Sequence, residues 1–204
     1  MCVPQDCQRK RGILFVVSGP SGVGKDTVLE RAFQRLSGIV RSVSATTRPP
    51  RNGEVEGIDY YFYSQDRFLA EIEQNAFLEY AQYGKNYYGT PSAPVEANLE
   101  AGNDVILKIE VQGALKIKHL RPDARLIFIQ PPHFDILEAR LKHRSTDSPE
   151  KIAERLEIAK QELAQRHEYH HLMTNDGLEE AVDALCAIIT AERSRVQNES
   201  APEI

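Results

Sequence analysis

The stretch that decides the fold of this chain reads Gly19-Pro20-Ser21-Gly22-Val23-Gly24-Lys25-Asp26-Thr27. It follows the apolar run 13–17 and precedes a helical pattern that begins at Thr27. A strand, a glycine-rich loop, a lysine and a helix in this order are typical of a phosphate-binding loop. Its backbone N–H groups can converge on phosphate oxygens, and the helix N-terminus adds partial positive charge. The stretch therefore predicts a nucleotide site in which Lys25 reaches the β- and γ-phosphates.

One residue of the loop departs from the usual pattern. The Ser or Thr that normally ligates magnesium is replaced by Asp26, and Thr27 follows one residue later. We expect Mg²⁺ to accompany the nucleotide, with Asp26 as the metal-binding residue, or Thr27 if the helix start shifts by one residue.

Composition sets the broad class. With 204 residues, 41% apolar and 27% charged, the sequence is typical of one or two compact globular units. The net charge of −5 argues against broad nucleic-acid binding, and no apolar run approaches the roughly 18 residues of a membrane span. Three cysteines form no disulfide framework, and the polar, basic leader lacks the apolar segment of a signal peptide. We expect a cytoplasmic protein without nucleic-acid or membrane partners.

Strand and helix patterns alternate along most of the chain. Short apolar runs predict parallel strands at 13–17, 104–109, 125–130 and 171–174. Helical patterns are found at 25–37, 66–74, 91–101, 111–120, 133–143, 149–168 and 177–196. This alternation predicts an α/β fold with a central parallel sheet flanked by helices.

The chain divides into several predicted regions. Residues 42–90 are rich in Thr, Tyr, Arg, Pro and Gly, which indicates an inserted, mostly β lobe that presents side chains to a ligand. Residues 134–160 are dense in charge and form a predicted helical lid. The sheet-bearing core is assigned to 12–41, 91–133 and 161–196, between a flexible leader at 1–11 and a frayed tail at 197–204.

Several separated motifs resemble the guanylate kinase family of P-loop nucleoside monophosphate kinases. They are the segments 42–51, 53–62, 77–80 and 86–90, then 111–114, Arg140 to Arg144, and 174–176. Their order and number make the match more specific than the phosphate-binding loop alone, and it covers roughly residues 12–190. The resemblance implies a P-loop kinase core with a GMP-binding lobe, ATP and GMP as substrates, and transfer of the γ-phosphate of ATP to GMP or dGMP.

The resemblance also implies roles for individual residues. The phosphate of GMP would be bound by Arg48, Arg51, Tyr60 and Tyr88. The guanine base would be contacted by Glu79, Ser44 and Thr90. Glu110 would lie near the base and the reacting phosphates. Gly19 to Thr27 would bind ATP, and Asn175 would contact its adenine. The catalytic cations would be Lys25, Arg48 and the lid residues Arg140, Arg144 and Arg155, because a planar guanidinium can hold two phosphate oxygens at once. Tyrosines in a β lobe are more often packing residues than ligands, and we expect this of Tyr61 and Tyr63; only the family match singles out Tyr60 and Tyr88.

A second departure from the family pattern is Lys108, which stands where the family usually carries the first acid of an Asp-x-Asp pair. We therefore hypothesise an exchange of charge, in which Asp26 supplies the carboxylate that position 108 lacks and Lys108 pairs with it. An additional negative charge beside the β-phosphate would otherwise need a cation close by.

Alternative functions remain open from the sequence. Gly-Lys-Asp in the loop also resembles ribose bisphosphate phosphokinases, although such an enzyme has no need for Glu79, Ser44 and the tyrosines. The other alternative is an inactive guanylate-kinase-like module that binds a protein, but such modules tend to lose the phosphate-binding loop. His167, His170 and His171 suggest a metal site, yet no convincing ligand set completes it, and we expect histidines at the surface end of a helix.

Overall fold

The structure is a computed structural model that describes residues 11–144 and 148–199, without the side chains of residues 143 and 144. Residues 1–10 of the predicted leader, residues 200–204 of the predicted tail and the side chain of Arg144 therefore lie outside the described residues. In the described part of the chain, no helix combines the length and the apolar character needed to cross a membrane.

In the described part of the chain, five parallel strands form the central sheet, and the sequence predicts four of them. They are β1 (Leu14–Ser18), β2 (Ile39–Arg41), β7 (Asp104–Lys108), β8 (Arg125–Gln130) and β9 (His171–Thr174), in the order β2-β7-β1-β8-β9. Strand β2 was not predicted, because three residues are too short to show a periodicity. The order places β1, which leads into the phosphate-binding loop, in the middle of the sheet.

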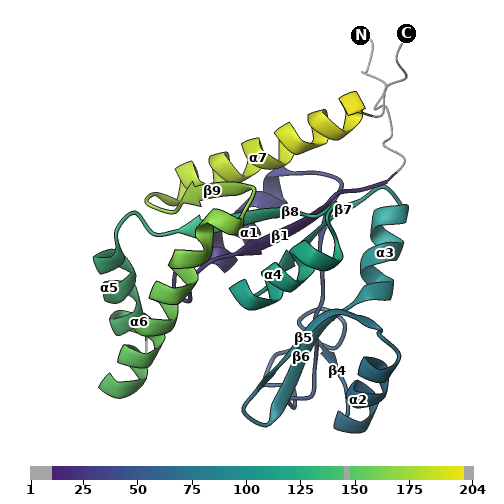
Figure 1. The fold of residues 1–204 in the computed structure, drawn as a ribbon, viewed down its shortest axis with the longest axis horizontal. Helices are drawn as coiled ribbons and strands as arrows, with labels where there is room; N and C mark the ends of the chain where they lie inside the picture. The colour runs from purple at the N-terminus through teal and green to yellow at the C-terminus, as the bar shows by residue number, and fades with distance from the viewer. Residues whose placement is uncertain (1–10, 145–147, 200–204) are drawn as a thin grey trace.

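Alternate residues of each strand point to opposite faces of the sheet, and helices cover both faces. In β1, Phe15 and Val17 pack with α1 (Lys25–Arg35) and α7 (Leu178–Glu199), while Leu14 and Val16 pack with α3 (Ser92–Glu100) and α4 (Val111–Leu120). Figure 1 shows α7 on one side of the sheet and α3 and α4 on the other. Helix α7 extends to Glu199, into the stretch that we expected to be a frayed tail.

The segment between β2 and α3 forms a second, smaller sheet with one helix. It contains β3 (Ala45–Thr46), β4 (Tyr61–Phe62), β5 (Phe77–Tyr83), β6 (Asn86–Pro91) and α2 (Gln65–Glu73), and its strand order is β4-β3-β6-β5. Phe68 of α2 is fully buried and stacks on Phe77, with ring centroids 4.4 Å apart. Tyr61 and Tyr63 pack against each other at 6.3 Å, as expected for packing residues. In Figure 1 this lobe projects from the core beside α3.

Two helices project from the core on the other side of the molecule, as Figure 1 shows. They are α5 (Phe134–Arg144) and α6 (Pro149–Ala164), and α6 continues into the short 3₁₀ helix η1 (Gln165–Glu168). Leu137 and Leu141 of α5 are buried in the core cluster beside the phosphate-binding loop. The helices of the predicted lid are thus anchored next to the loop.

The three histidines near the start of β9 have separate partners. The His170 ring accepts a hydrogen bond from a backbone N–H of β8, and His171 lies in β9 with its ring nitrogen 2.8 Å from Glu192 of α7. Burial by itself raises the pKa of Glu192, but hydrogen bonds from Arg195, His171 and Arg125 outweigh it and lower that pKa to about 2. The expectation of histidines at a helix end was wrong for His171, because His171 is the first residue of β9, in the strand predicted at 171–174, and lies against α7. Among the described residues, no group of three or more His, Cys, Asp or Glu forms a metal cluster.

Candidate active site

The phosphate-binding loop connects the centre of the sheet to α1 through backbone conformations that favour glycine. Gly19 has φ +149°, and a Cβ there would lie 2.2 Å from the carbonyl oxygen of Ile129. Gly24 has φ +97°, and a Cβ there would lie 2.5 Å from Nδ2 of Asn175. A side chain at either position would combine a left-handed backbone with a clash. The close packing holds the loop in one shape at the end of β1.

Helix α1 begins at Lys25 and presents its N-terminus to the loop. Gly24 is the N-cap and supplies no side-chain hydrogen bond, so the first N–H groups of the helix are not capped by a side chain. The ammonium group of Lys25 donates to the carbonyl oxygens of Gly19 and Pro20, the latter at 3.2 Å. Burial lowers the pKa of Lys25, although the charges of Glu110 and Glu162 oppose the shift. This combination of uncapped N–H groups and a lysine is suited to binding phosphate.

Side chains from distant elements support the loop from outside. Asn175, which is only 8% exposed after β9, donates from Nδ2 to the carbonyl oxygen of Val23 at 2.7 Å. Arg140 of α5 donates to the same carbonyl and to that of Asn175, both at 3.3 Å, and Arg155 of α6 donates to Oγ of Ser21 at 2.8 Å. The structure thus brings Arg140, Arg155 and Asn175 to the loop, and shows Asn175 in contact with loop backbone.

Asp26 and Lys108 form an ion pair, as hypothesised from the sequence. Lys108 Nζ lies 2.5 Å from Oδ1 of Asp26, and the guanidinium of Arg41 lies 3.4 Å from the same oxygen. Burial tends to raise the pKa of Asp26, but the hydrogen bond from Lys108 and the positive charges of Lys108, Arg41 and Lys25 outweigh it, so the pKa is lowered. Asp26 is therefore a carboxylate surrounded by cations.

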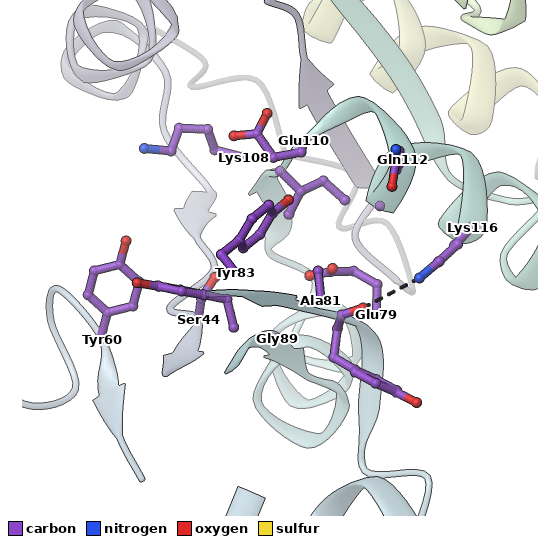
Figure 2. A pocket seen from close by; sticks show the side chains of 14 residues that line it. Ser44, Tyr60, Glu79, Ala81, Tyr83, Gly89, Lys108, Glu110, Gln112 and Lys116 are labelled. Atoms are coloured by element: carbon purple, nitrogen blue, oxygen red, sulfur yellow. Dashed lines mark hydrogen bonds between the residues drawn. The ribbon is translucent and has the colours of Figure 1, made fainter. Parts of the chain in front are cut away.

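A cavity of about 380 Å³ lies between the lobe and the carboxyl end of β7. It is lined by Ser44, Tyr60, Glu79, Tyr80, Ala81, Tyr83, Tyr88, Gly89, Lys108, Ile109, Glu110, Gln112, Gly113 and Lys116. Figure 2 shows Lys108 and Glu110 on one side of this cavity and the strand that carries Glu79 across from them. Five of the eight residues predicted to bind GMP are in the lining, and they come from both the lobe and the core.

Glu79 is held by its cross-strand neighbour. It lies opposite Thr90 in the β5–β6 hairpin, beyond a register shift between Phe77 and Glu79, and Oγ1 of Thr90 donates to Oε1 of Glu79 at 2.8 Å. Thr90 itself is 1% exposed, so it lies behind Glu79 and is absent from the cavity lining. Burial raises the pKa of Glu79, while the hydrogen bond from Thr90 and the charge of Lys116 act against the shift. A Cβ on Gly113 would lie 3.1 Å from Oε2, so α4 packs close against this carboxylate.

The predicted phosphate-binding side chains of the lobe gather beside the cavity. Arg48 makes an ion pair with Glu54, with N–O distances of 2.8 and 3.0 Å, and its guanidinium lies 5.5 Å from the ring centre of Tyr60. The rings of Tyr60 and Tyr88 meet edge to face at 6.2 Å. Arg48 and Arg51 are absent from the lining, and Arg51 is exposed next to Glu54, which accepts from its backbone N–H.

Sequence reasoning missed further residues of the site, among them Glu162 and Tyr83. Glu162 of α6 lies near Glu110 and near the backbone of Ser21. Burial and the negative charge of Glu110 raise the pKa of Glu162 to about 7. Glu162 is seven residues after Arg155, so both lie on one face of α6, and this spacing was the available signal. Tyr83 lies at the end of β5, and no motif in the sequence includes it.

Oxygen donors for a divalent cation are present next to the loop. Magnesium in kinases is usually held by one or two protein oxygens, with phosphate and water oxygens completing its octahedron. Asp26 and Thr27, in the first turn of α1, lie beside the loop, and either is the right type of ligand. The carboxylate of Asp26 is already bound to Lys108 and Arg41, whereas Thr27 offers a neutral hydroxyl. The residues present therefore fit Mg²⁺ brought in with a nucleotide.

Comparison with known proteins gives one consistent result. The chain matches the family model described as "Guanylate kinase" over residues 11–192. It is 52% identical to a guanylate kinase of Thermus thermophilus over 185 residues, which are 91% of this chain and 84% of that protein. It is 46% identical to one of Desulfitobacterium hafniense over 190 residues, 93% of this chain and 95% of that protein. The crystal structure of guanylate kinase from Anaplasma phagocytophilum matches with TM-score 0.72 and 33% identity, and the match covers 90% of this chain and 87% of that one.

The loop on the parallel sheet, together with the cavity that faces it from an inserted lobe, defines a P-loop kinase of the nucleoside monophosphate kinase class. Within that class, the chain belongs to the guanylate kinase family. The leading interpretation of the sequence is confirmed, and neither the ribose bisphosphate kinase nor the inactive binding module is supported.

Proposed function

We propose that this chain transfers the γ-phosphoryl group of ATP to the phosphate of GMP or dGMP, giving ADP and the corresponding diphosphate. The observation that carries the proposal is the position of Glu79. It is a carboxylate in a cavity that also contains Lys108 and Glu110, at the carboxyl end of the strand next to β1. If the guanine base of GMP contacts Glu79, the phosphate of GMP would point toward the phosphate-binding loop.

Glu79 explains the choice of base. Guanine carries two adjacent donors, N1–H and the exocyclic N2–H₂, which a carboxylate can accept together, while Ser44 in the same lining would bond to O6. Adenine would turn the lone pair of N1 toward Glu79 and leave a buried charge without a donor. A polar site that loses its partner in this way discriminates by about 10⁴-fold. Thr90 supports the recognition by holding Oε1 of Glu79 in place.

The chemical step needs positioning and charge compensation more than a strong base. The nucleophile is a phosphate oxygen, and negative charge is spread over the transferred phosphoryl group. Lys25 and the backbone of the loop would hold the phosphates of ATP. Arg48 and Arg51, with Tyr60 and Tyr88, would hold the phosphate of GMP. Arg140, Arg144 and Arg155 of the lid would act on the phosphates between the two nucleotides.

Magnesium belongs to the proposal as the partner of ATP. When bound, it would supply a divalent charge that offsets the negative charge of the phosphates. Thr27 or Asp26 would hold it on the protein side. Asn175 would complete the ATP site, because it supports the backbone of the loop next to the place where adenine would bind. The proposal includes the cytoplasmic location expected from the sequence.

The test is a substrate panel. ADP release from ATP and Mg²⁺ would be followed with GMP, dGMP, AMP, UMP and ribose bisphosphate as acceptors. We expect turnover with GMP and dGMP and a value of kcat/KM for AMP lower by about 10⁴-fold. Turnover confined to ribose bisphosphate, or ADP release that does not depend on any acceptor, would contradict the proposal.

A further inference from the structure

Lys108 lies beside the phosphate-binding loop and also lines the cavity that faces the lobe. It is the last residue of β7 and pairs in register with Val17 of β1, at the point where β1 enters the phosphate-binding loop. Its side chain is 29% exposed and lines the same cavity as Tyr60 and Tyr88. Because parallel strands end at one edge of a sheet, Lys108 and the loop are brought together by the fold itself.

The ammonium group of Lys108 is held by an ion pair with Asp26. The two residues are 82 positions apart, and Lys108 Nζ lies 2.5 Å from Oδ1 of Asp26. Figure 2 shows the Lys108 side chain extending away from Glu110, its neighbour along the chain. Arg41, at the end of β2, meets the same carboxylate oxygen at 3.4 Å. Asp26 therefore gathers two cations from the ends of two strands beside the loop.

Stability is a weak explanation for this ion pair. The side chain of Asp26 is 56% exposed, and ion pairs with this degree of exposure contribute little to the free energy of unfolding. At the same time the pair places a second ammonium close enough to Lys25 for its charge to act on that lysine. Asp26, Glu110 and Glu162 offset part of the repulsion between the two lysines, and an incoming phosphate would offset more of it. The arrangement is suited to a site that receives phosphate.

We propose that Lys108 binds the phosphate of the acceptor nucleotide and that Asp26 is the positioning residue that holds Lys108 toward it. The inference rests on the proposed function, because it takes GMP as the acceptor. A lysine is a compact cation on a flexible four-carbon stem, so Lys108 can contact the acceptor phosphate while remaining near Asp26. With Asp26 engaged in this way, Thr27 is the residue of the first turn that remains for Mg²⁺.

The decisive experiment compares GMP with guanosine, which has the same base but no phosphate. Binding of both would be measured by calorimetry, without ATP, in the wild type and in Lys108→Gln. We expect GMP to bind roughly ten- to a hundredfold more weakly to the variant, because a hydrogen bond between charged groups is lost, and guanosine to bind unchanged. Lys108→Arg, which keeps the charge, should retain most of the affinity for GMP. The matched control is Lys85→Gln, which removes an equal charge from the exposed β5–β6 turn.

The role of Asp26 is tested by a double-mutant cycle on GMP affinity. Asp26→Asn should weaken GMP binding severalfold when Lys108 is present, and should have no further effect in Lys108→Gln. A merely structural residue would weaken binding equally in both backgrounds. Additive effects, or tighter GMP binding by Asp26→Asn, would contradict the positioning role. Thermal unfolding of every variant shows whether it is folded at the temperature of the binding experiment.

The outcomes separate this inference from the proposed function. If the wild type binds neither GMP nor guanosine, the proposed function fails. If the wild type binds GMP and Lys108→Gln binds it equally well, the proposed function stands and the role of Lys108 is overturned. Weaker binding of both GMP and guanosine to Lys108→Gln would also overturn it, because the residue would then act on the shape of the cavity and not on the phosphate.

Discussion

The phosphate-binding loop and the acceptor lobe are built by different means. The loop would bind through backbone N–H groups, and strand β1, which leads into it, is fully buried in the central sheet. The lobe would bind through side chains on a four-stranded sheet whose β5 strand is half-buried to exposed along its length. Where ATP would bind, the site and the core of the protein therefore share residues. On the acceptor side, the site lies on a small scaffold of its own.

This difference predicts how each side responds to substitution. Changes in the backbone of the loop should reduce stability and activity together, because Gly19 and Gly24 touch core elements. Changes in the side chains of the lobe should alter substrate choice with little effect on the free energy of unfolding. Four predictions test the contrast, from the largest expected effect to the smallest.

Lys25→Met should abolish phosphoryl transfer while the protein stays folded. The ammonium group donates to loop carbonyls, and a lost cation at the transferring phosphates costs about a thousandfold in kcat. Single-turnover kinetics with saturating ATP and GMP would measure the loss. GMP binding without ATP is the internal control and should be preserved. Activity within about tenfold of the wild type would remove Lys25 from the catalytic cations.

Glu79→Gln should change specificity and not stability. An amide can accept from only one of the two guanine donors and presents its own NH₂ to the other, so the ratio of kcat/KM for GMP over AMP should fall by about a hundredfold. Burial raises the pKa of Glu79, so replacing it with a neutral group should leave the free energy of unfolding unchanged or slightly increased. Kinetics with both acceptors and urea unfolding would check both parts. A large loss of stability would show that the lobe and its site are not separable in this way.

Gly24→Ala should destabilise the protein by about 2–3 kcal/mol and weaken ATP binding, since it adds a clash with Asn175 to the strain of a left-handed backbone. Gly53→Ala is the matched control. Its φ of +89° is similar to that at Gly24, but no atom lies within 4 Å of the added Cβ. The control should lose only about 1 kcal/mol and keep its ATP affinity. Equal losses at the two positions would mean that the loop is not braced by Asn175.

Glu162→Gln should remove a pH dependence of stability. In the folded protein the pKa of Glu162 is about 7, above its ordinary value of 4.5, so folding favours the protonated form. Its contribution to stability is fully present below pH 4.5 and is lost as the pH rises through 7. Since Glu162 is partly exposed, we expect about 1 kcal/mol between about pH 5 and pH 8.

Urea unfolding of the nucleotide-free protein at these two pH values would measure this change. The variant should have a flatter profile than the wild type and be the more stable of the two at the higher pH. Glu157→Gln, an exposed glutamate of the same helix, is the control and should leave the profile as it is. An unchanged slope in Glu162→Gln would show that Glu162 is not the titrating group.

Much of the fold could be predicted from the sequence, because local patterns reflect local contacts. The strands β1, β7, β8 and β9 were predicted to within one residue at each end, since buried parallel strands are short apolar runs. The helix predicted for 149–168 divides into α6 and η1, a change in hydrogen bonding that has no signature in residue type. Strand β2 was missed because it is held by the pairing of three residues with β7.

The sequence by itself determined the phosphate-binding loop, the α/β core and the family, because each depends on contiguous residues or on motifs in a fixed order. Only the tertiary structure decided which distant side chains meet. Thr90 holds Glu79 because the β5–β6 hairpin places them opposite each other, and Glu162 reaches the loop because α6 folds back onto it. The sequence showed Asp26 and Lys108 as two departures from the family pattern and led to the hypothesis that they pair. They form one ion pair because β7 and β1 are neighbours that end at the same edge of the sheet.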